Sequence, residues 1–296
     1  MTGNVVTLIA ETLDAELVSE LRAALDRLGA EVGPPRWLAE NVACDLDFID
    51  LDPDQADAAA RLVIGERAVD VLAQPAGGRR KRLLVADMES TLIENEMLDE
   101  LADFVGLRAE IAAITARAMN GELDFEGAIV ARVKLLAGLP VSTLETAAER
   151  ITLMPGARAL IATMRAAGAR TVLVSGGFRF FTRIVAGQLG MDAEFANDLD
   201  IAQGKLAGTV AKPILGRQAK FDRLVQEAAA AALPLAATLS VGDGANDLDM
   251  ILAAGLGIAY RAKPAVAARA QWRIEHSDLT ALLYAQGYRA DEILSG

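Results

Sequence analysis

The sequence predicts an α/β fold: a doubly wound parallel sheet with a helical insertion, preceded by a small α/β unit. After residue 80, short apolar runs alternate with helix-like segments. Runs without polar alternation are typical of parallel strands that are buried on both faces. A stretch with proline and glycine, 74–78, separates this region from a shorter one with another pattern. We therefore expect an N-terminal domain over 1–76 and a larger domain over 80–296.

The N-terminal region has the elements of a small α/β unit. Residues 5–11 predict a strand, and 14–29 predict an amphipathic helix with leucines at helical spacing. Residues 43–51 alternate like a strand, 54–66 like a helix, and 68–74 like a further strand.

The second region supplies the parallel sheet. Its strands are predicted at four apolar runs, 83–86, 171–174, 238–242 and 256–260. Residues 198–212 predict a hairpin that turns at 203–205. Residues 94–150 are helical in character and follow the first strand directly, so we expect a helical insertion that covers the site. The four basic residues at 79–82 are expected to be a solvated start of the first strand.

Composition limits the function classes. The chain has 296 residues, 41 acidic and 29 basic, with a formal net charge of -12. This charge argues against nucleic-acid binding, which requires lysine and arginine facing phosphates. It leaves room for an anionic small substrate, because a bound divalent cation reverses the local field.

No membrane span is expected either. The longest uncharged run, 228–242, contains Pro234 and is shorter than the roughly 20 apolar residues a span needs. Cys44 is the single cysteine, so no internal disulfide forms. The N-terminus has no basic stretch before its apolar run, which argues against a signal peptide. Together these features favour a cytoplasmic protein.

Polar residues follow three of the predicted strands. Residues 87–91 read Asp-Met-Glu-Ser-Thr, 175–178 read Ser-Gly-Gly-Phe, and 243–247 read Asp-Gly-Ala-Asn-Asp. Each segment alone is also compatible with an ordinary turn or helix cap. In an open α/β sheet, however, ligands bind beyond the carboxyl ends of the strands. The three segments in this order therefore predict one site.

The residue types at this edge indicate phosphate chemistry. Asp87 and Glu89 face the same way in an extended chain, and they repel each other unless a cation lies between them or one of them is protonated. Asp243 ends another strand and can approach them. Oxygen ligands of this kind suit Mg²⁺.

Donors for the phosphate are also present. Ser175 and the Gly176 backbone N–H can donate to phosphate oxygens, and Lys220 adds a compact positive charge. A carboxylate nucleophile with a nearby acid/base group would split the hydrolysis into two displacements.

These segments resemble the motifs of the phosphoserine phosphatases of the haloacid dehalogenase (HAD) superfamily, over about residues 82–289. The resemblance implies a HAD-like core and Asp87 as the nucleophile. It implies Mg²⁺ held by Asp87, the backbone carbonyl of Glu89, and Asp243. It places Asn246 on the phosphate side and Asp247 in support of the metal. The implied reaction converts O-phospho-L-serine to serine and phosphate through an aspartyl-phosphate, the last step of serine biosynthesis.

The resemblance extends to the insertion, expected over about 94–150. Glu96 matches a glutamate that binds the substrate ammonium, and Arg132 matches the arginine that binds its carboxylate, a pairing that suits a guanidinium. Met119 and Phe125 match apolar residues that close over the ligand.

Glu89 departs from the family pattern, which has aspartate as general acid and base. The extra methylene changes its reach, and positional errors of about 1 Å can cost about a hundredfold in rate. We expect activity, slower than is usual in the family.

Two alternatives stay open. The chain could hydrolyse another small phosphorylated amino acid, because Glu96 and Arg132 do not measure side-chain length. It could also act mainly as a catalytically weak amino-acid sensor, since the N-terminal unit resembles small regulatory modules of ACT type by pattern. The sequence also leaves open the oligomeric state, a homodimer included, and the choice between Mg²⁺ and Mn²⁺.

Overall fold

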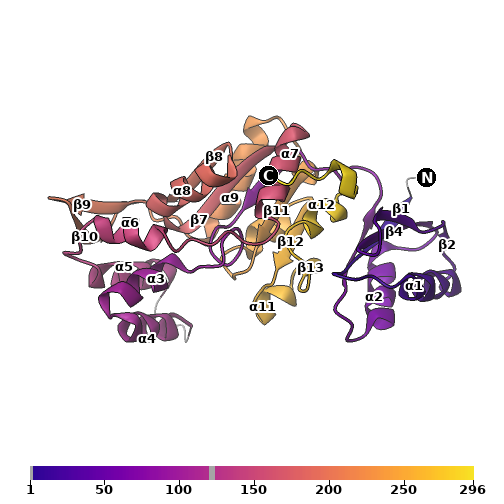
Figure 1. Ribbon diagram of the computed structural model, residues 1–296, viewed down its shortest axis with the longest axis horizontal. Coiled ribbons are helices and arrows are strands. Elements are labelled where there is room, and N and C mark those ends of the chain that lie inside the picture. Colours follow the sequence, from indigo (N-terminus) through magenta and orange to yellow (C-terminus); the bar gives the residue numbers. More distant parts are fainter. Residues whose placement is uncertain (1–2, 120–123) are drawn as a thin grey trace.

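A six-stranded sheet lies in the middle of the molecule (Figure 1). The computed structural model describes residues 3–119 and 124–296. The strands of the sheet are β6 (Leu83–Ala86), β7 (Arg170–Phe178), β8 (Ala193–Asn197), β11 (Thr238–Gly242), β12 (Leu256–Tyr260) and β13 (Trp272–Ile274). Their order is β13-β12-β11-β6-β7-β8, and all neighbouring pairs are parallel. The four predicted strands are present, whereas β8 and β13 were not foreseen.

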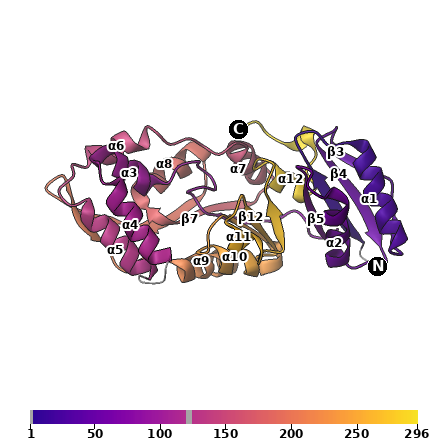
Figure 2. The same cartoon turned by 90° about the horizontal axis from the view of Figure 1, so that it is seen from below.

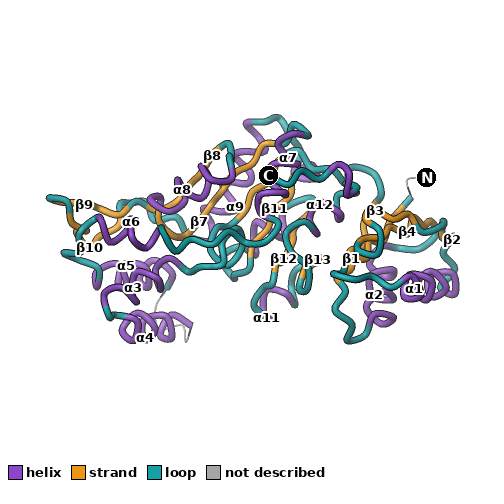
Figure 3. The backbone as a smooth tube through the Cα atoms, viewed as in Figure 1, coloured by secondary structure: helices purple, strands orange, loops and turns teal. Residues whose placement is uncertain are grey.

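Helices cover both faces of this sheet (Figure 3). They are α7 (Ala157–Ala166), α8 (Arg179–Leu189), α9 (Arg217–Ala230), α10 (Leu248–Ala253), α11 (Pro264–Ala267) and α12 (Ala281–Ala285), with short 3₁₀ turns at Leu235–Ala237 and Ala290–Glu292. Leu84 lies in one core with side chains of α7 and α8. Leu83 and Val85 lie in a second core with Leu224 of α9 and Met250 of α10. The doubly wound arrangement is confirmed, and burial on both faces explains why β6 has no polar alternation.

Helices and a hairpin form the end of the molecule beyond the sheet (Figures 1 and 2). The helices are α3 (Met97–Val105), α4 (Arg108–Met119), α5 (Phe125–Leu135) and α6 (Ser142–Ala148), and the hairpin strands are β9 (Leu199–Ala202) and β10 (Lys205–Val210). The hairpin turns at Gln203 and Gly204, both with positive φ, as the sequence predicts. The N–H of Gly138 donates to Leu206 O at 2.8 Å, and the N–H of Leu206 donates to Leu139 O at 2.8 Å. The hairpin is thus bonded to the helical insertion.

The other end of the molecule carries an antiparallel sheet. Its strands are β1 (Asn4–Ile9), β2 (Glu31–Val32), β3 (Arg36–Ala39), β4 (Ala43–Ile49) and β5 (Asp70–Pro75), and its helices are α1 (Ala15–Arg27) and α2 (Pro53–Ile64). The strand order is β2-β4-β1-β5, with β3 also paired to β4. Leu8 and Leu46 pack with Leu17 and Leu21 of α1 and Ala60 of α2 on one face. The predicted strands and helices are present, and the short β2 and β3 are additions.

The opposite face of this sheet packs against the C-terminal part of the chain. Leu72 shares a core with Tyr284 of α12, and Trp272 Nε1–H donates to Ala73 O at 2.9 Å. Arg79 pairs with the fully buried Asp45 at 2.7 Å.

The expectation that residues 79–82 are solvated is wrong for two of them. Arg79 and Lys81 are both 8% exposed. Arg79 also donates to Thr7 Oγ1 and to the carbonyls of Tyr284 and Ala285, partners far away in the sequence.

None of the helices in the described ranges is long and apolar enough to cross a membrane.

Candidate functional site

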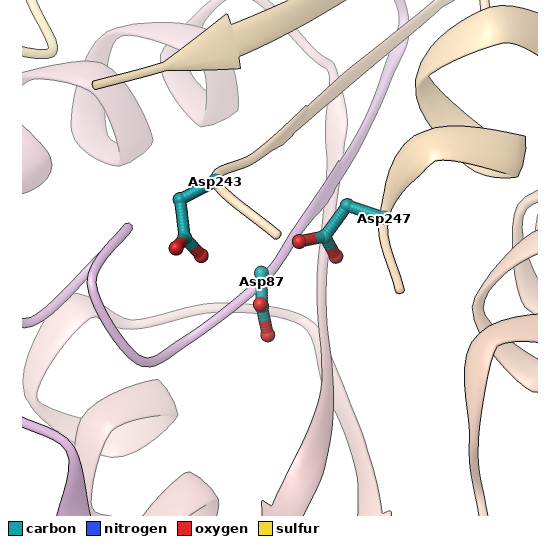
Figure 4. Close-up of side chains that lie close together, drawn as sticks. All are labelled: Asp87, Asp243 and Asp247. Carbon is teal, nitrogen blue, oxygen red and sulfur yellow. The ribbon is translucent and has the colours of Figure 1, made fainter. Parts of the chain in front are cut away.

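Three aspartates meet at the carboxyl edge of the parallel sheet. Asp87 follows β6, Asp243 follows β11, and Asp247 lies at the start of α10. One carboxylate oxygen of each lies within 4.8 Å of the others, and all three residues are buried. Asp243 and Asp247 lie on either side of Asp87 (Figure 4). The expected convergence of two strand ends therefore occurs.

Glycines make the loop at 242–247 sterically feasible. A Cβ on Gly242 would lie 2.3 Å from Asp247 Cγ, and one on Gly244 would lie 2.3 Å from Asn246 Oδ1. The N–H of Gly244 donates to Asp247 Oδ2 at 3.0 Å. The loop thus folds over Asp247 and orients its carboxylate, while half-buried Asn246 lies against Gly244.

Lys220 is the buried cation of the site. Its Nζ lies 2.7 Å from Asp87 Oδ2 and 2.6 Å from Asp247 Oδ1. Burial lowers the pKa of Lys220, but the charges of Asp247 and Asp87 outweigh this and raise it above its usual value. Lys220 therefore stays protonated and bridges two of the aspartates.

The site nevertheless carries an excess of negative charge. Burial, followed by repulsion from Asp247, raises the pKa of Asp87 well above its usual value. The same two causes raise the pKa of Asp243 to about 6, although Lys263 opposes them from 3.7 Å. A further cation among these carboxylates would relieve the repulsion.

The Ser-Gly-Gly segment forms the extended end of β7 rather than a loop beyond it. Ser175 is 1% exposed, and its Oγ accepts from the N–H of Gly177 at 2.9 Å. The Gly176 carbonyl accepts from Asn197 Nδ2–H at 2.8 Å. This bonding holds Ser175 and Gly176 beside the strand that leads to Asp87, since β7 is the neighbour of β6.

Glu89 connects the sheet edge to the insertion. Its Oε1 accepts from the N–H of Met97, the first residue of α3, at 2.8 Å. Its Oε2 lies 2.9 Å from the position that a Cβ on Gly177 would take. Burial, then the charge of Glu96, raises the pKa of Glu89 to about 7. The longer side chain thus reaches a helix N-terminus, where a carboxylate is favourable.

The other predicted residues of the insertion lie around Glu89. Glu96 is exposed, and its Oε1 accepts from Ser90 Oγ at 2.8 Å. Burial lowers the pKa of half-buried Arg132, while the charges of Glu89, Asp99 and Glu96 oppose the shift. Arg132 Nε–H donates to Ala128 O of its own helix at 3.2 Å.

Phe125 meets the sheet edge directly. A Cβ on Gly176 or on Gly216 would lie 3.0 Å from an atom of its ring. The side chain of Met119 lies outside the described residues.

Sequence reasoning missed Asn197 and Lys263. Asn197 ends β8, a strand whose second residue, Glu194, obscures the apolar pattern. Lys263 lies in the segment after β12, another strand end, and could have been found by extending the strand-end argument to that strand.

Comparison with known proteins places this site in a family. Residues 84–252 match the haloacid dehalogenase-like hydrolases. The chain belongs to this family. The matched range includes Asp87, Lys220, Asp243 and Asp247 of this hydrolase.

Sequence alignments with relatives of the hydrolase cover most or nearly all of its length. It is 37% identical over 294 residues to a phosphoserine phosphatase from Streptomyces coelicolor, covering 98% of this chain and 72% of the relative. It is 43% identical over 233 residues to a phosphoserine phosphatase from Mycobacterium tuberculosis, covering 78% of this chain and 57% of the relative. The structure of a HAD family hydrolase from Salmonella enterica superposes with a TM-score of 0.84 at 28% identity, covering 95% of this chain and 98% of that chain.

Proposed function

We propose that this hydrolase is a Mg²⁺-dependent phosphatase that converts O-phospho-L-serine and water into L-serine and phosphate. The proposal rests on the buried cluster of three carboxylates bridged by Lys220. The relatives named phosphoserine phosphatases, at 37% and 43% identity, support the choice of substrate.

A magnesium ion fits the donor set. The carboxylate oxygens of Asp87, Asp243 and Asp247 lie within 4.8 Å of one another, and hard oxygen ligands suit Mg²⁺. Burial, followed by repulsion from Asp247, raises the pKa values of Asp87 and Asp243, and a bound cation relieves the repulsion. We assign Asp87, Asp243 and the backbone carbonyl of Glu89 as ligands, with Asp247 in support. Bound Mg²⁺ would neutralise part of the negative charge that otherwise keeps a carboxylate away from a phosphoryl group.

Asp87 is the proposed nucleophile. Its carboxylate attacks phosphorus, an aspartyl phosphate forms, and the bond from phosphorus to the serine oxygen breaks. Water then attacks the aspartyl phosphate, releasing phosphate and regenerating Asp87. The Met88 N–H at 2.8 Å and Lys220 Nζ at 2.7 Å hold the two oxygens of Asp87 in place. Ser175 Oγ and the Gly176 N–H are the proposed donors to the phosphoryl oxygens, together with Lys220 and Asn246.

Glu89 is the proposed proton carrier. It gives its proton to the leaving serine oxygen and then takes one from the attacking water. A carboxyl with a pKa raised to about 7 suits both roles near neutral pH. The Met97 N–H fixes its orientation at 2.8 Å. The acid/base group is thus held by the insertion as well as by its own strand end.

The insertion supplies the proposed recognition of the amino acid. Glu96 would bind the ammonium group, and Arg132 would bind the carboxylate as a forked donor. The Phe125 ring, seated against Gly176, would exclude water from one side of the ligand. The sequence assigns the same role to Met119.

The test is phosphate release from L-phosphoserine, with and without Mg²⁺. We expect turnover only with the metal, and none from Asp87→Asn, which keeps the shape of the side chain but removes the nucleophile. Phosphothreonine and phosphohomoserine in the same assay separate the alternative substrates. Turnover of another phosphorylated amino acid without turnover of phosphoserine would replace the proposed substrate. Inactivity of the wild type, with activity in Glu89→Asp, would show that glutamate at this position abolishes catalysis.

A further inference from the structure

Asn197 joins two backbone segments that flank the site, the end of β7 and the segment before α9. It is the last residue of β8 and is 2% exposed. Its Nδ2–H group donates to Gly176 O at 2.8 Å and to Leu215 O at 3.2 Å, and its Oδ1 accepts from the N–H of Leu215 at 2.7 Å. One buried amide therefore fixes the separation of the two backbone segments.

Each of these segments leads to a group that faces phosphate in the proposed mechanism. Gly176 directly follows Ser175 at the end of β7. Leu215 precedes Gly216, the N-cap of α9, which carries Lys220 on its first turns. The separation of the hydroxyl and N–H donors from the lysine therefore depends on a bridge between the two segments.

The same bridge shapes the seat of Phe125. A Cβ on Gly176 or Gly216 would lie 3.0 Å from the Phe125 ring, so the ring contacts both segments that Asn197 joins. Asn197 also stands at the base of the β9–β10 hairpin, where the N–H of Ala211 donates to Asp198 O at 2.9 Å. Movements of the insertion and the hairpin would therefore be transmitted through Asn197 to the end of β7 and the start of α9.

We propose that Asn197 is a positioning residue, which holds the Ser175–Gly176 segment and the start of α9 at the separation that lets both act on one phosphoryl group. The inference rests on the proposed phosphatase function and deepens it. Misplacement of such groups by about 1 Å can cost about a hundredfold in rate. Loss of the bridge should therefore weaken phosphoryl binding and turnover without affecting the proposed metal ligands that follow β6 and β11.

A matched control lies at the opposite end of the same pair of strands. Asp192, just before β8, accepts from the N–H of Thr171 in β7 at 2.8 Å and from its Oγ1–H at 3.0 Å. Like Asn197, it ties β7 to the β8 region through a side chain. Asp192→Ala should therefore lower the stability of the fold, as the Asn197 variants should, but it should not weaken phosphoryl binding.

The experiment uses the full chain and beryllofluoride, a phosphoryl mimic, with Mg²⁺. Titration calorimetry measures the affinities for beryllofluoride and for Mg²⁺ in wild type, Asn197→Ala, Asn197→Asp and Asp192→Ala. Thermal unfolding measures the stability of the same four proteins. Asn197→Asp keeps the side-chain volume and the acceptor for the Leu215 N–H, but it replaces the donor to Gly176. It also provides a variant of native size if the alanine variant does not fold.

We expect both Asn197 variants to bind beryllofluoride roughly 10- to 100-fold more weakly, with a similar fall in kcat/KM for phosphoserine and unchanged Mg²⁺ affinity. Asp192→Ala should bind beryllofluoride as the wild type does. Unchanged beryllofluoride affinity in the Asn197 variants, or an equal loss in Asp192→Ala, would overturn the inference. Wild type that binds beryllofluoride but leaves phosphoserine intact would refute the substrate alone, because this binding does not depend on the amino acid.

Discussion

Replacing Lys220 by methionine tests whether charge compensation holds the site together. Lys220 Nζ lies 2.7 Å from Asp87 and 2.6 Å from Asp247, and all three side chains are buried. Removing one partner of a buried ion pair costs about 3–5 kcal/mol, because it leaves a charge without compensation. Methionine is unbranched and adapts to irregular space, so the loss should reflect charge rather than a cavity.

The loss should depend on pH in a defined direction. Burial and Asp247 hold the pKa of Asp87 well above its usual value, and removal of Lys220 should raise it further. A carboxyl with a raised pKa in the folded state stabilises the fold at low pH and loses that contribution as pH rises through the folded pKa. We therefore expect Lys220→Met to be about 3–5 kcal/mol less stable than wild type at pH 8 without metal, and closer to it at pH 5.

Urea unfolding followed by circular dichroism measures this difference by linear extrapolation. Lys263→Met is the control, because Lys263 is exposed and 3.7 Å from Asp243, where an ion pair contributes at most about 1 kcal/mol. Under the proposed function, Mg²⁺ should reduce the deficit of Lys220→Met. Equal deficits at pH 5 and pH 8, or wild-type stability at pH 8, would refute the reasoning.

Three further predictions concern other parts of the molecule. Glu89→Gln keeps an acceptor for the Met97 N–H but can neither give nor take a proton near neutral pH, so kcat should fall about 10²- to 10⁴-fold while calorimetry gives an unchanged Mg²⁺ affinity. Arg79→Met should lower the unfolding free energy by about 3 kcal/mol, since it leaves buried Asp45 short of a partner. Arg36 pairs with the same carboxylate but is itself exposed, so Arg36→Met should cost about 1 kcal/mol or less, and similar losses for the two variants in urea would contradict this. Burial raises the pKa of the Cys44 thiol to about 11, so a thiol reagent at pH 8 should label it only after unfolding, and rapid labelling of the native protein would be inconsistent with its position.

The parallel sheet was predictable where its strands are continuous and apolar. β6 is apolar throughout, and β11 carries no charged residue, its two hydroxyl residues Thr238 and Ser240 being buried. β8 contains Glu194, which accepts from Thr182 Oγ1–H at 2.6 Å, and β13 has three residues. A strand whose charged residue is paired with a side chain of another element does not show an apolar pattern. A strand of three residues is too short to show a periodicity.

The aspartate cluster was predictable because topology alone brings strand ends together. The connections made by Glu89 and Asn197 were not. Each depends on a backbone group of another element, the Met97 N–H in one case and the Gly176 carbonyl in the other. Arg79 is a third example, since its burial depends on Asp45 and on the far C-terminal carbonyl of Ala285. Such contacts follow from the packed fold rather than from spacing in the chain.

The bonding of the β9–β10 hairpin to the insertion restricts how the site can open. The two pieces leave the parallel sheet separately, one after β6 and the other after β8, and each returns to it. Four backbone segments therefore tether a single outer layer to the sheet. A layer attached at four points should resist sliding and twisting more than a layer attached at two. Lengthening one tether with glycines should loosen the layer, which makes these segments places to adjust turnover by engineering.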